Sequence, residues 1–330
     1  MKKGQQRFTY FLNQLQALLT KAAKQKKPAL WLYRNNARTP LFMLEGLAKM
    51  YACIHNKKKF TKLKEHFKLL EDGMGAIDYY DAMAKDLATN KNIPATVINY
   101  LQAGCREKIQ SLNEILIEKK WTGSSENRIE KIQQKLAGAN WMEEAAEIKN
   151  IEEFYGEAIY SVAEFTLQKK YHFDNIEEGV HELRRRLRWL SIYPQALKGC
   201  VQLVKPKTTV KHLTKYCTKE ITGSPFNKMP DAGDSKYLLL FDQNYFYSLS
   251  WMIAELGKIK DSGLHVIAVK EALQAAAAES DAIAYKKTYQ LLGAKQKKLK
   301  QLLDNAGAIV KTYFTEQNLE HLVLGTRVLK

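Results

Sequence analysis

Residues 180–190 carry two stripes of opposite character at the spacing of an α-helix, and they constrain the fold more than any other segment. The apolar stripe recurs every three or four residues and consists of Val180, Leu183, Leu187 and Leu190. The neighbouring stripe is cationic and consists of His181, Arg184, Arg185 and Arg188. Like charges at this spacing repel one another, and the segment holds a single acid, Glu182. The pattern predicts a helix that packs through one stripe and binds an anionic partner through the other.

A weaker copy of this spacing lies about 150 residues earlier in the chain. Arg34 and Arg38 occupy its cationic positions, and Trp31 stands where the later copy has a histidine. Its apolar side is supplied by Leu30, Tyr33, Ala37, Leu41 and Leu44. The two copies predict an internal repeat, with each basic helix at a similar place in its half of the chain.

The formal net charge of +17 is concentrated around these two copies. Residues 20–64 and 180–219 together contain 22 lysines and arginines but only two acids, Glu45 and Glu182. The rest of the chain has 30 basic and 33 acidic residues, so it contributes no positive excess. Two separate basic blocks are typical of a protein that binds a polyanion.

Composition favours an all-α fold for the 330 residues, since Ala, Leu, Lys, Glu and Gln are abundant and Pro and Gly are few. We find no run of alternating polar and apolar residues that predicts a strand. The four cysteines are widely spaced and form no C-x-x-C pair, as expected of free thiols in the cytoplasm. No apolar run predicts a secretory signal or a membrane span.

Helical periodicity and breaking residues divide the chain into two predicted bundles, residues 1–140 and 141–330. The helices expected in the first are 5–24, 28–55 with a kink or a new start at Pro40, 60–89, 94–119 and 126–138, with a break at Gly123–Ser125. Those expected in the second are 147–171, the basic helix from about 176 with Asp174 or Asn175 as its cap, 236–258, 262–303 with a break near Glu279–Ser280, and 306–326. Residues 205–235 have no counterpart in the first bundle and are predicted to be an insertion.

The motif His-x-x-Arg-x-x-x-Arg at 181–188, with its copy at 31–38, resembles the conserved histidine α-helical domain, or CHAD, family. Leu256-Gly257-Lys258-Ile259-Lys260-Asp261 is similar to the family's L-G-x-x-R-D step, and Met74-Gly75-Ala76-Ile77-Asp78 is a degraded copy of it. The resemblance implies two tandem, pseudo-symmetric helical bundles with a basic cleft or pore between them. It also implies that the cleft binds inorganic polyphosphate without catalysis, and that the protein can reside on polyphosphate granules in the cytoplasm.

The residues predicted to contact the polyanion come from both basic blocks, and arginine suits bidentate phosphate contacts. They are His181, Arg184, Arg185, Arg188, Arg34, Arg38, Lys27, Lys58, Lys62, Lys207, Lys211 and Lys215. The alternative for the charged residues is a solvated surface, and for His181 a capping or core position. No motif predicts a metal or a cofactor, and none marks a catalytic centre.

Two other functions remain open at this point. An RNA- or DNA-binding protein would expose aromatic rings on its basic face, although Trp31, Tyr33, Trp189 and Tyr193 stand at spacings more typical of a core. An enzyme of phosphate metabolism would need acid and base residues brought together from distant parts of the chain.

Overall fold

The computed structural model describes residues 1–122, 127–208, 210–277 and 279–329, and 72% of the chain is helical, which confirms the predicted all-α class. The helices of the first part are α1 (Lys3–Ala22), α2 (Pro28–Arg34), α3 (Arg38–Ile54), α4 (Lys57–Ala88), α5 (Ala95–Glu118) and α6 (Arg128–Ala137). Those of the second part are α7 (Glu144–Gln168), the π-helical turn η1 (Ile176–His181), α8 (Glu182–Ala196), α9 (Lys219–Thr222), α10 (Gln243–Ala277), α11 (Asp281–Leu292) and α12 (Leu299–Thr315). The predicted break at Gly123–Ser125 lies outside the described residues.

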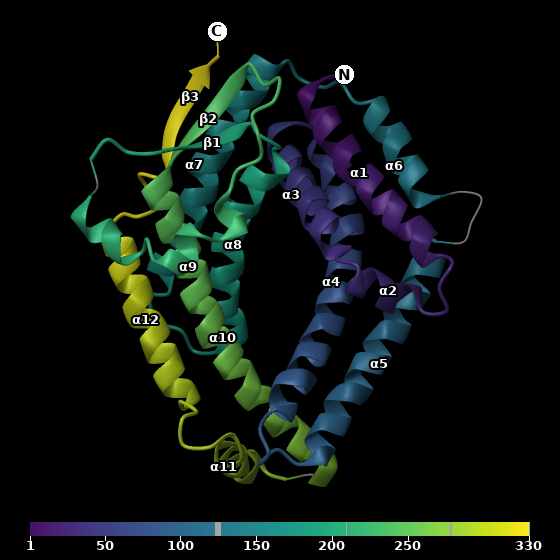
Figure 1. The fold of residues 1–330 in the computed structure, drawn as a ribbon, viewed down its shortest axis with the longest axis vertical. Coiled ribbons are helices and arrows are strands. Elements are labelled where there is room, and N and C mark those ends of the chain that lie inside the picture. Colours follow the sequence, from purple (N-terminus) through teal and green to yellow (C-terminus); the bar gives the residue numbers. More distant parts are fainter. Residues whose placement is uncertain (123–126, 209, 278, 330) are drawn as a thin grey trace.

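Helices α1 to α6 form one side of the molecule, and α7, α8, α10 and α12 form the other (Figure 1). The two sides meet at both ends. At one end, Arg7 of α1 donates a hydrogen bond from Nη1 to Glu147 Oε2 of α7 at 2.6 Å and another from Nε to the Leu197 carbonyl at 3.1 Å. Tyr51 of α3 donates to Glu147 Oε1 at 2.6 Å, and all three side chains are buried. At the other end, α10 packs against α4 and α5.

The segment containing the first basic copy is two helices rather than one. Helix α2 ends at Arg34 and α3 begins at Arg38, with Asn36 between them at a φ of 61°. Of the two alternatives predicted for Pro40, the kink in a continuous helix is wrong and the start of a new helix is confirmed to within two residues, since α3 begins at Arg38 and Pro40 lies in its first turn. Proline is tolerated there, since a first-turn N–H has no helical acceptor. Trp31 and Arg34 consequently do not share a helix with Arg38.

The second basic copy forms the predicted helix. The Asn175 side chain accepts a hydrogen bond from the Glu178 N–H at 2.7 Å and caps η1, which continues into α8. The apolar stripe is fully packed, with exposures between 0% and 1% for Val180, Leu183, Leu187 and Leu190. Because that stripe anchors the helix in the core, the cationic stripe is turned towards the space between the two sides.

A small three-stranded sheet lies at one end of the second side, where helices were predicted. Strand β1 (Val201–Val204) pairs in parallel with β2 (Tyr237–Asp242), which pairs antiparallel with β3 (Val323–Val328). The expectation of no strands was therefore wrong. The helix predicted to begin at 236 begins at Gln243, after β2, and the helix predicted to end at 326 ends at Thr315, before β3. Leu238, Leu239 and Phe241 of β2 are buried, so an apolar run interpreted as helical serves as a short central strand.

Between β1 and β2, the described residues 205–208 and 210–235 are mostly irregular and include three short helical turns, η2 (Lys211–Lys215), α9 and η3 (Pro225–Asn227). From Gly223 to Asp234 the chain is irregular apart from η3, as its Gly, Pro and Asp residues indicate. Helix α10 runs unbroken through the gap predicted at 259–261. The break near Glu279–Ser280 is confirmed, whereas the connection between α11 and α12 was not predicted.

Candidate functional site

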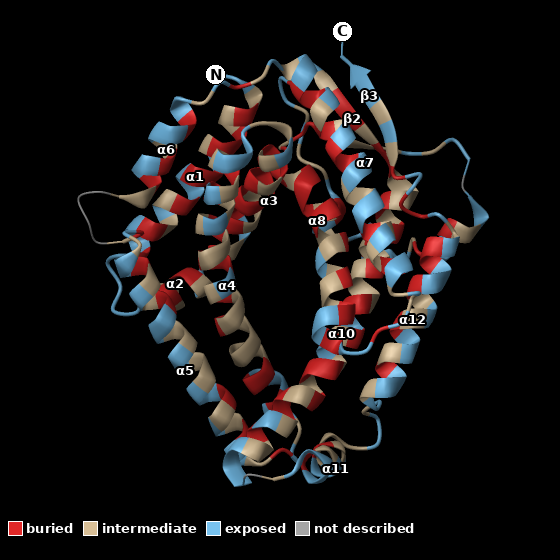
Figure 2. Cartoon of the chain, turned by 180° about the vertical axis from the view of Figure 1, so that it is seen from behind, coloured by how far each residue is buried: buried red, intermediate tan, exposed pale blue. Residues whose placement is uncertain are grey.

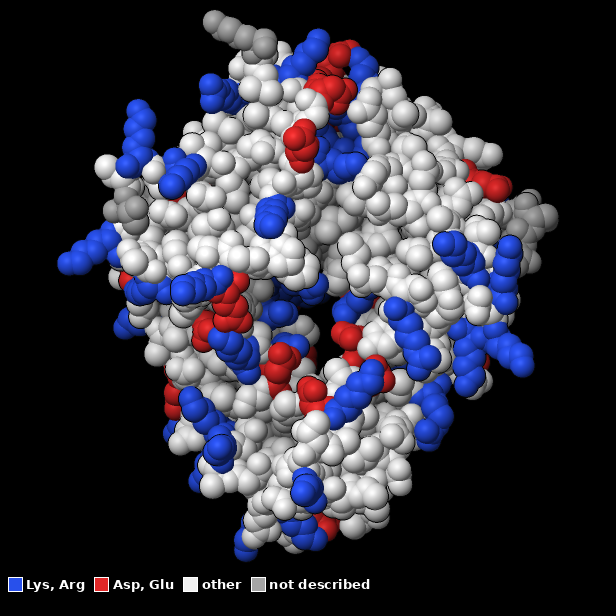
Figure 3. Space-filling model, viewed as in Figure 1, with Lys and Arg blue, Asp and Glu red and all other residues white. Residues whose placement is uncertain are grey.

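A cavity of about 660 Å³ opens between η1 and α8 on one side and α3 and α4 on the other. The helix faces around this space include many partly buried residues (Figure 2), and the space-filling view shows the opening at the centre of the molecule (Figure 3). The sequence prediction is confirmed in one respect, since side chains of both basic copies line the same cavity. Those side chains are Arg38, His181, Arg184, Arg185 and Arg188.

The cavity is lined by both signs of charge, not by cations alone. Five lysines or arginines line it together with six carboxylates, which are Glu45, Glu71, Asp72, Glu177, Glu178 and Glu182. Blue and red side chains accordingly both surround the central opening in Figure 3. Which cations are available to a ligand therefore depends on how the carboxylates are paired.

Arg188 is the cation with the fewest partners. Its guanidinium lies 4.3 Å from the centre of the Phe42 ring, and it forms no ion pair within the part of the chain that the structure describes. Burial lowers its pKa to about 10, and the nearby charges of Arg184 and Arg38 contribute to the shift. A half-buried cation that is unpaired and surrounded by other cations is stabilised by any anion that reaches it.

Arg184 is placed in a similar state one turn earlier on α8. Its Nε donates a hydrogen bond to the Ile253 carbonyl of α10 at 3.1 Å, and it has no ion pair among the described residues. Burial lowers its pKa, and Asp261 opposes this effect from a distance. The hydrogen bond to α10 fixes the orientation of the guanidinium and uses one of its five N–H donors.

Arg38 faces the same cavity from α3 and, unlike Arg184 and Arg188, is ion-paired. Its Nε donates to Glu71 Oε1 and its Nη1 donates to Asp78 Oδ2, both at 2.8 Å. The Tyr33 hydroxyl lies 2.9 Å from Asp81 Oδ2 and 3.1 Å from the other oxygen of Asp78, so these two carboxylates share its one proton. The carboxylates of Glu71 and Asp78 thus neutralise one guanidinium.

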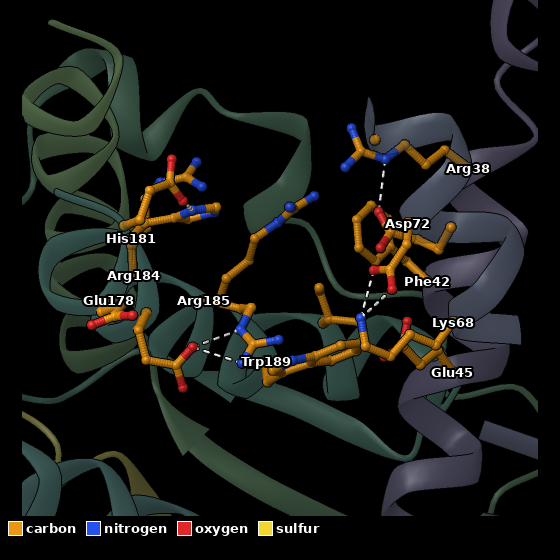
Figure 4. Close-up of a pocket in the computed structure, with 16 residues that line it drawn as sticks. Arg38, Phe42, Glu45, Lys68, Asp72, Glu178, His181, Arg184, Arg185 and Trp189 are labelled. Atoms are coloured by element: carbon orange, nitrogen blue, oxygen red, sulfur yellow. Dashed lines mark hydrogen bonds and ion pairs between the residues drawn. The ribbon is translucent and has the colours of Figure 1, made fainter. Parts of the chain in front are cut away.

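Arg185 and His181 are also paired with carboxylates of their own helix. Arg185 and Arg186 share Glu182, and hydrogen bonds from both hold the pKa of Glu182 below its usual value although burial alone would raise it. His181 Nδ1 lies 2.8 Å from Glu177 Oε2, and this hydrogen bond lowers the pKa of Glu177. Figure 4 shows His181 and Arg185 on the side of η1 and α8, opposite Arg38 of α3 and Lys68 of α4.

Glu45 is a cavity carboxylate that is buried and has no ion pair among the described residues. It is 6% exposed, and its Oε2 lacks a hydrogen-bond partner among the described residues. Burial raises its pKa to about 7, and the charge of Glu71 adds to the shift. Lys49, one turn further along α3, lies 5.0 Å from the Trp189 ring centre, and burial lowers its pKa to about 8.

The two glycine motifs meet the two arginines. A Cβ at Gly75 of α4 would lie 2.8 Å from Arg38 Nη2, and one at Gly257 of α10 would lie 3.1 Å from Arg184 Nε. Arg38 and Arg184 therefore have similar glycine neighbours, whereas the predicted repeat matched Arg38 with Arg188. In the sequence, an offset of 146 residues pairs Arg38 with Arg184 and also pairs Leu41 and Leu44 with buried leucines of α8.

The other predicted binding residues do not line this cavity. Arg34, Lys27, Lys58 and Lys62 are exposed on the first side, and Lys207, Lys211 and Lys215 are exposed in the segment that joins β1 to β2. Lys215 forms an ion pair with Glu316. Trp189 and Tyr193 belong to the core, with exposures of 8% and 1%, which confirms that interpretation of their spacing.

Sequence reasoning missed the carboxylates of the cavity, although some left a signal. Asp78 belongs to the degraded glycine motif, and Glu45 is the only acid of its basic block. Glu71 and Asp72 lie on α4 outside both basic blocks, so nothing local connected them with the arginines.

Among the described residues, no group of three or more His, Cys, Asp or Glu side chains is placed to hold a metal ion. No helix in the described ranges is both long and apolar enough to cross a bilayer. Comparison with protein-family models, with curated proteins and with solved structures gave no significant match.

Proposed function

We propose that the central cavity binds inorganic polyphosphate without catalysis, through Arg184 and Arg188 of α8. The observation that carries this proposal is that both guanidiniums are partly buried and lack an ion pair in the described part of the chain. A linear chain of phosphates supplies closely spaced negative charge, and release of its counterions contributes free energy to binding. The resemblance to the CHAD family supports the same ligand, and residence on polyphosphate granules would follow from binding.

Nucleic acid is the less favoured polyanion because the cavity offers little for bases to stack on. Trp189 is buried, and the Phe42 ring is covered by the guanidiniums of Arg188 and, at 5.2 Å, Arg38. Binding of single-stranded RNA depends strongly on stacking with accessible aromatic rings. Polyphosphate needs only cations.

The test is a competition experiment with purified protein at fixed ionic strength, in which polyphosphate, RNA and heparin displace a labelled polyphosphate. We expect unlabelled polyphosphate to compete best. We also expect its affinity to fall linearly with salt on a log–log scale. If RNA displaced the probe better than polyphosphate at physiological salt, the nucleic-acid function would replace this one.

One observation favours an enzyme instead. Glu45 combines a pKa raised to about 7 with a place in a cavity lined by arginines, and such a group can serve as a general acid or base. The non-catalytic proposal predicts no release of orthophosphate from polyphosphate or nucleotides above the blank. Release that Glu45→Gln abolished would establish an enzyme.

A further inference from the structure

Arg38 and Arg184 have matching positions in the two halves but different electrostatic surroundings. Each lies against a glycine of a long helix, Gly75 in α4 and Gly257 in α10. Arg38 is bound by two carboxylates, whereas Arg184 is bound by a backbone carbonyl and has no ion pair among the described residues. Of these two arginines in the cavity, Arg38 is thus already paired with carboxylates, and Arg184 has no carboxylate partner among the described residues.

The contacts of Arg38 place two carboxylates against its guanidinium. Nε is taken by Glu71, Nη1 by Asp78, and Nη2 lies against α4 at Gly75. A bidentate contact with phosphate needs two adjacent N–H donors directed at the ligand. Because two carboxylates already compensate the charge of Arg38, a phosphate that reached it would be repelled by them and would gain little free energy. Arg188, beside the same Phe42 ring, has no such carboxylate among the described residues.

We propose that Glu71 and Asp78 are specificity-determining residues: they withhold Arg38 from the ligand, so that the cavity grips a polyphosphate through Arg184 and Arg188 of the second half alone. This inference rests on the polyphosphate binding proposed above. It goes further because it assigns unequal roles to the two halves of the chain. It also predicts that the cavity neutralises fewer phosphates than the number of arginines that line it.

The experiment releases Arg38 with Glu71→Gln and Asp78→Asn. Both replacements keep the size of the side chain, and the amide that replaces the Asp78 carboxylate retains an oxygen that can accept from Tyr33. Polyphosphate affinity is measured at pH 8 and at several salt concentrations. We expect affinity about tenfold higher than in the wild type, as one charged hydrogen-bonding group is added to the ligand site. We also expect the log–log salt slope to become steeper by roughly 0.7 to 0.9, the amount that corresponds to one more neutralised phosphate.

The control is Glu45→Gln with Glu178→Gln, which removes two cavity carboxylates that are not ion-paired in the described structure. At pH 8 it changes the net charge by about the same amount but releases no arginine. It should raise affinity by about threefold at most and leave the salt slope unchanged. Adding Arg38→Gln to the Glu71→Gln and Asp78→Asn variant should cancel the extra gain.

Equal gains in the two double variants, or a gain that persists without Arg38, would overturn the inference. If the releasing variant does not fold, single variants decide instead: Arg184→Gln should lower wild-type affinity about tenfold, while Arg38→Gln should lower it by about threefold at most, through the charge left uncompensated on Glu71 and Asp78. Equal losses would overturn the inference. A wild-type protein that binds no polyphosphate would refute the proposed function itself, and the inference with it.

Discussion

Arg38 on α3 and Arg184 on α8 show how two halves with similar local sequence can acquire different electrostatics. Arg38 begins α3 after the break that follows α2, and Arg184 lies in the first turn of α8, directly after η1. Both lie against a helix glycine. The difference comes from α4, which places Glu71 and Asp78 around Arg38, whereas α10 offers Arg184 a carbonyl oxygen and only the distant Asp261. The number of arginines in a helix thus says less about anion binding than the carboxylates of the helix packed against it.

The largest effect on polyphosphate affinity is expected from reversing the charges of Arg184 and Arg188, the two cavity arginines that have no ion pair among the described residues. Arg184→Glu with Arg188→Glu should weaken polyphosphate binding by about 100-fold or more, because each lost charged contact is worth about 1.5 to 3 kcal/mol. Titration at fixed salt measures the change, and circular dichroism verifies that the helices remain. The apolar stripe of α8 is untouched, so the fold should persist.

The matched control reverses two exposed lysines outside the cavity, Lys27→Glu with Lys58→Glu. The change in net charge is the same, and the expected loss of affinity is only a few-fold. Equal losses in the two variants would mean that polyphosphate binds over the basic surface rather than in the cavity.

The second effect separates the two arginines by stability in the absence of ligand. Arg38→Gln should lower the free energy of unfolding by about 1 to 2 kcal/mol, because Glu71 is mostly buried and loses its ion pair. Arg188→Gln should change it by less than about 1 kcal/mol, since the lost contact with Phe42 is offset by removal of an unpaired, half-buried charge. Urea unfolding followed by circular dichroism measures both. A larger loss in Arg188→Gln would make the second-half arginine the structural one.

The third effect is a pH dependence caused by Glu45. Its carboxyl is neutral below about pH 7 and negative above it, so polyphosphate affinity should fall about twofold as the pH rises through 7. The charged groups that act on it are Lys49 of its own helix and Lys68, Glu71 and Asp72 of α4. Glu45→Gln should remove this step, as measured by titration between pH 6 and 8.

The same carboxyl should affect stability. A raised pKa in the folded state means that the folded protein holds a proton which the unfolded chain releases near pH 4.5. Stability is therefore lost as the pH rises from about 4.5 to about 7, and Glu45→Gln should flatten that part of the profile. The exposed Glu65 of α4 provides the control, since Glu65→Gln should leave both profiles as in the wild type.

The last comparison is between the two glycines. Gly257→Ala would place a methyl group 3.1 Å from Arg184 Nε and should weaken polyphosphate binding by about threefold, through a shift of the guanidinium. Gly75→Ala crowds Arg38 in the same way but should leave the affinity unchanged, because Arg38 does not hold the ligand. A loss of affinity in Gly75→Ala equal to that in Gly257→Ala would contradict the unequal roles of the halves.

The parts of the fold that could be predicted from the sequence are those fixed by local periodicity. The stripes of α8 identified both its buried face and the face turned to the cavity, and the helix-breaking residues located most of the other helices. The strands could not be predicted in this way, because β1 and β2 are short apolar runs whose pairing joins segments more than 30 residues apart.

The sequence predicted only the basic residues of the candidate site and not its carboxylates. Clusters of arginine are visible along the sequence, but Glu71 reaches Arg38 across 33 positions and Asp78 across 40. Their pairing is a product of helix packing between α3 and α4. The exposed lysines were included because they are close in sequence to the arginines, and closeness in sequence did not place them in the cavity.

The buried contacts of Arg7, Tyr51 and Glu147 at one end, and the packing of α10 on α4 and α5 at the other, make the molecule a closed frame. Because the two sides are joined at both ends, they cannot move apart at either end without breaking these contacts. A ligand therefore has to enter along the axis of the opening rather than be clasped by a hinge. A linear polymer suits this geometry, because a short stretch of it can occupy the frame while its two ends continue into solvent on opposite faces.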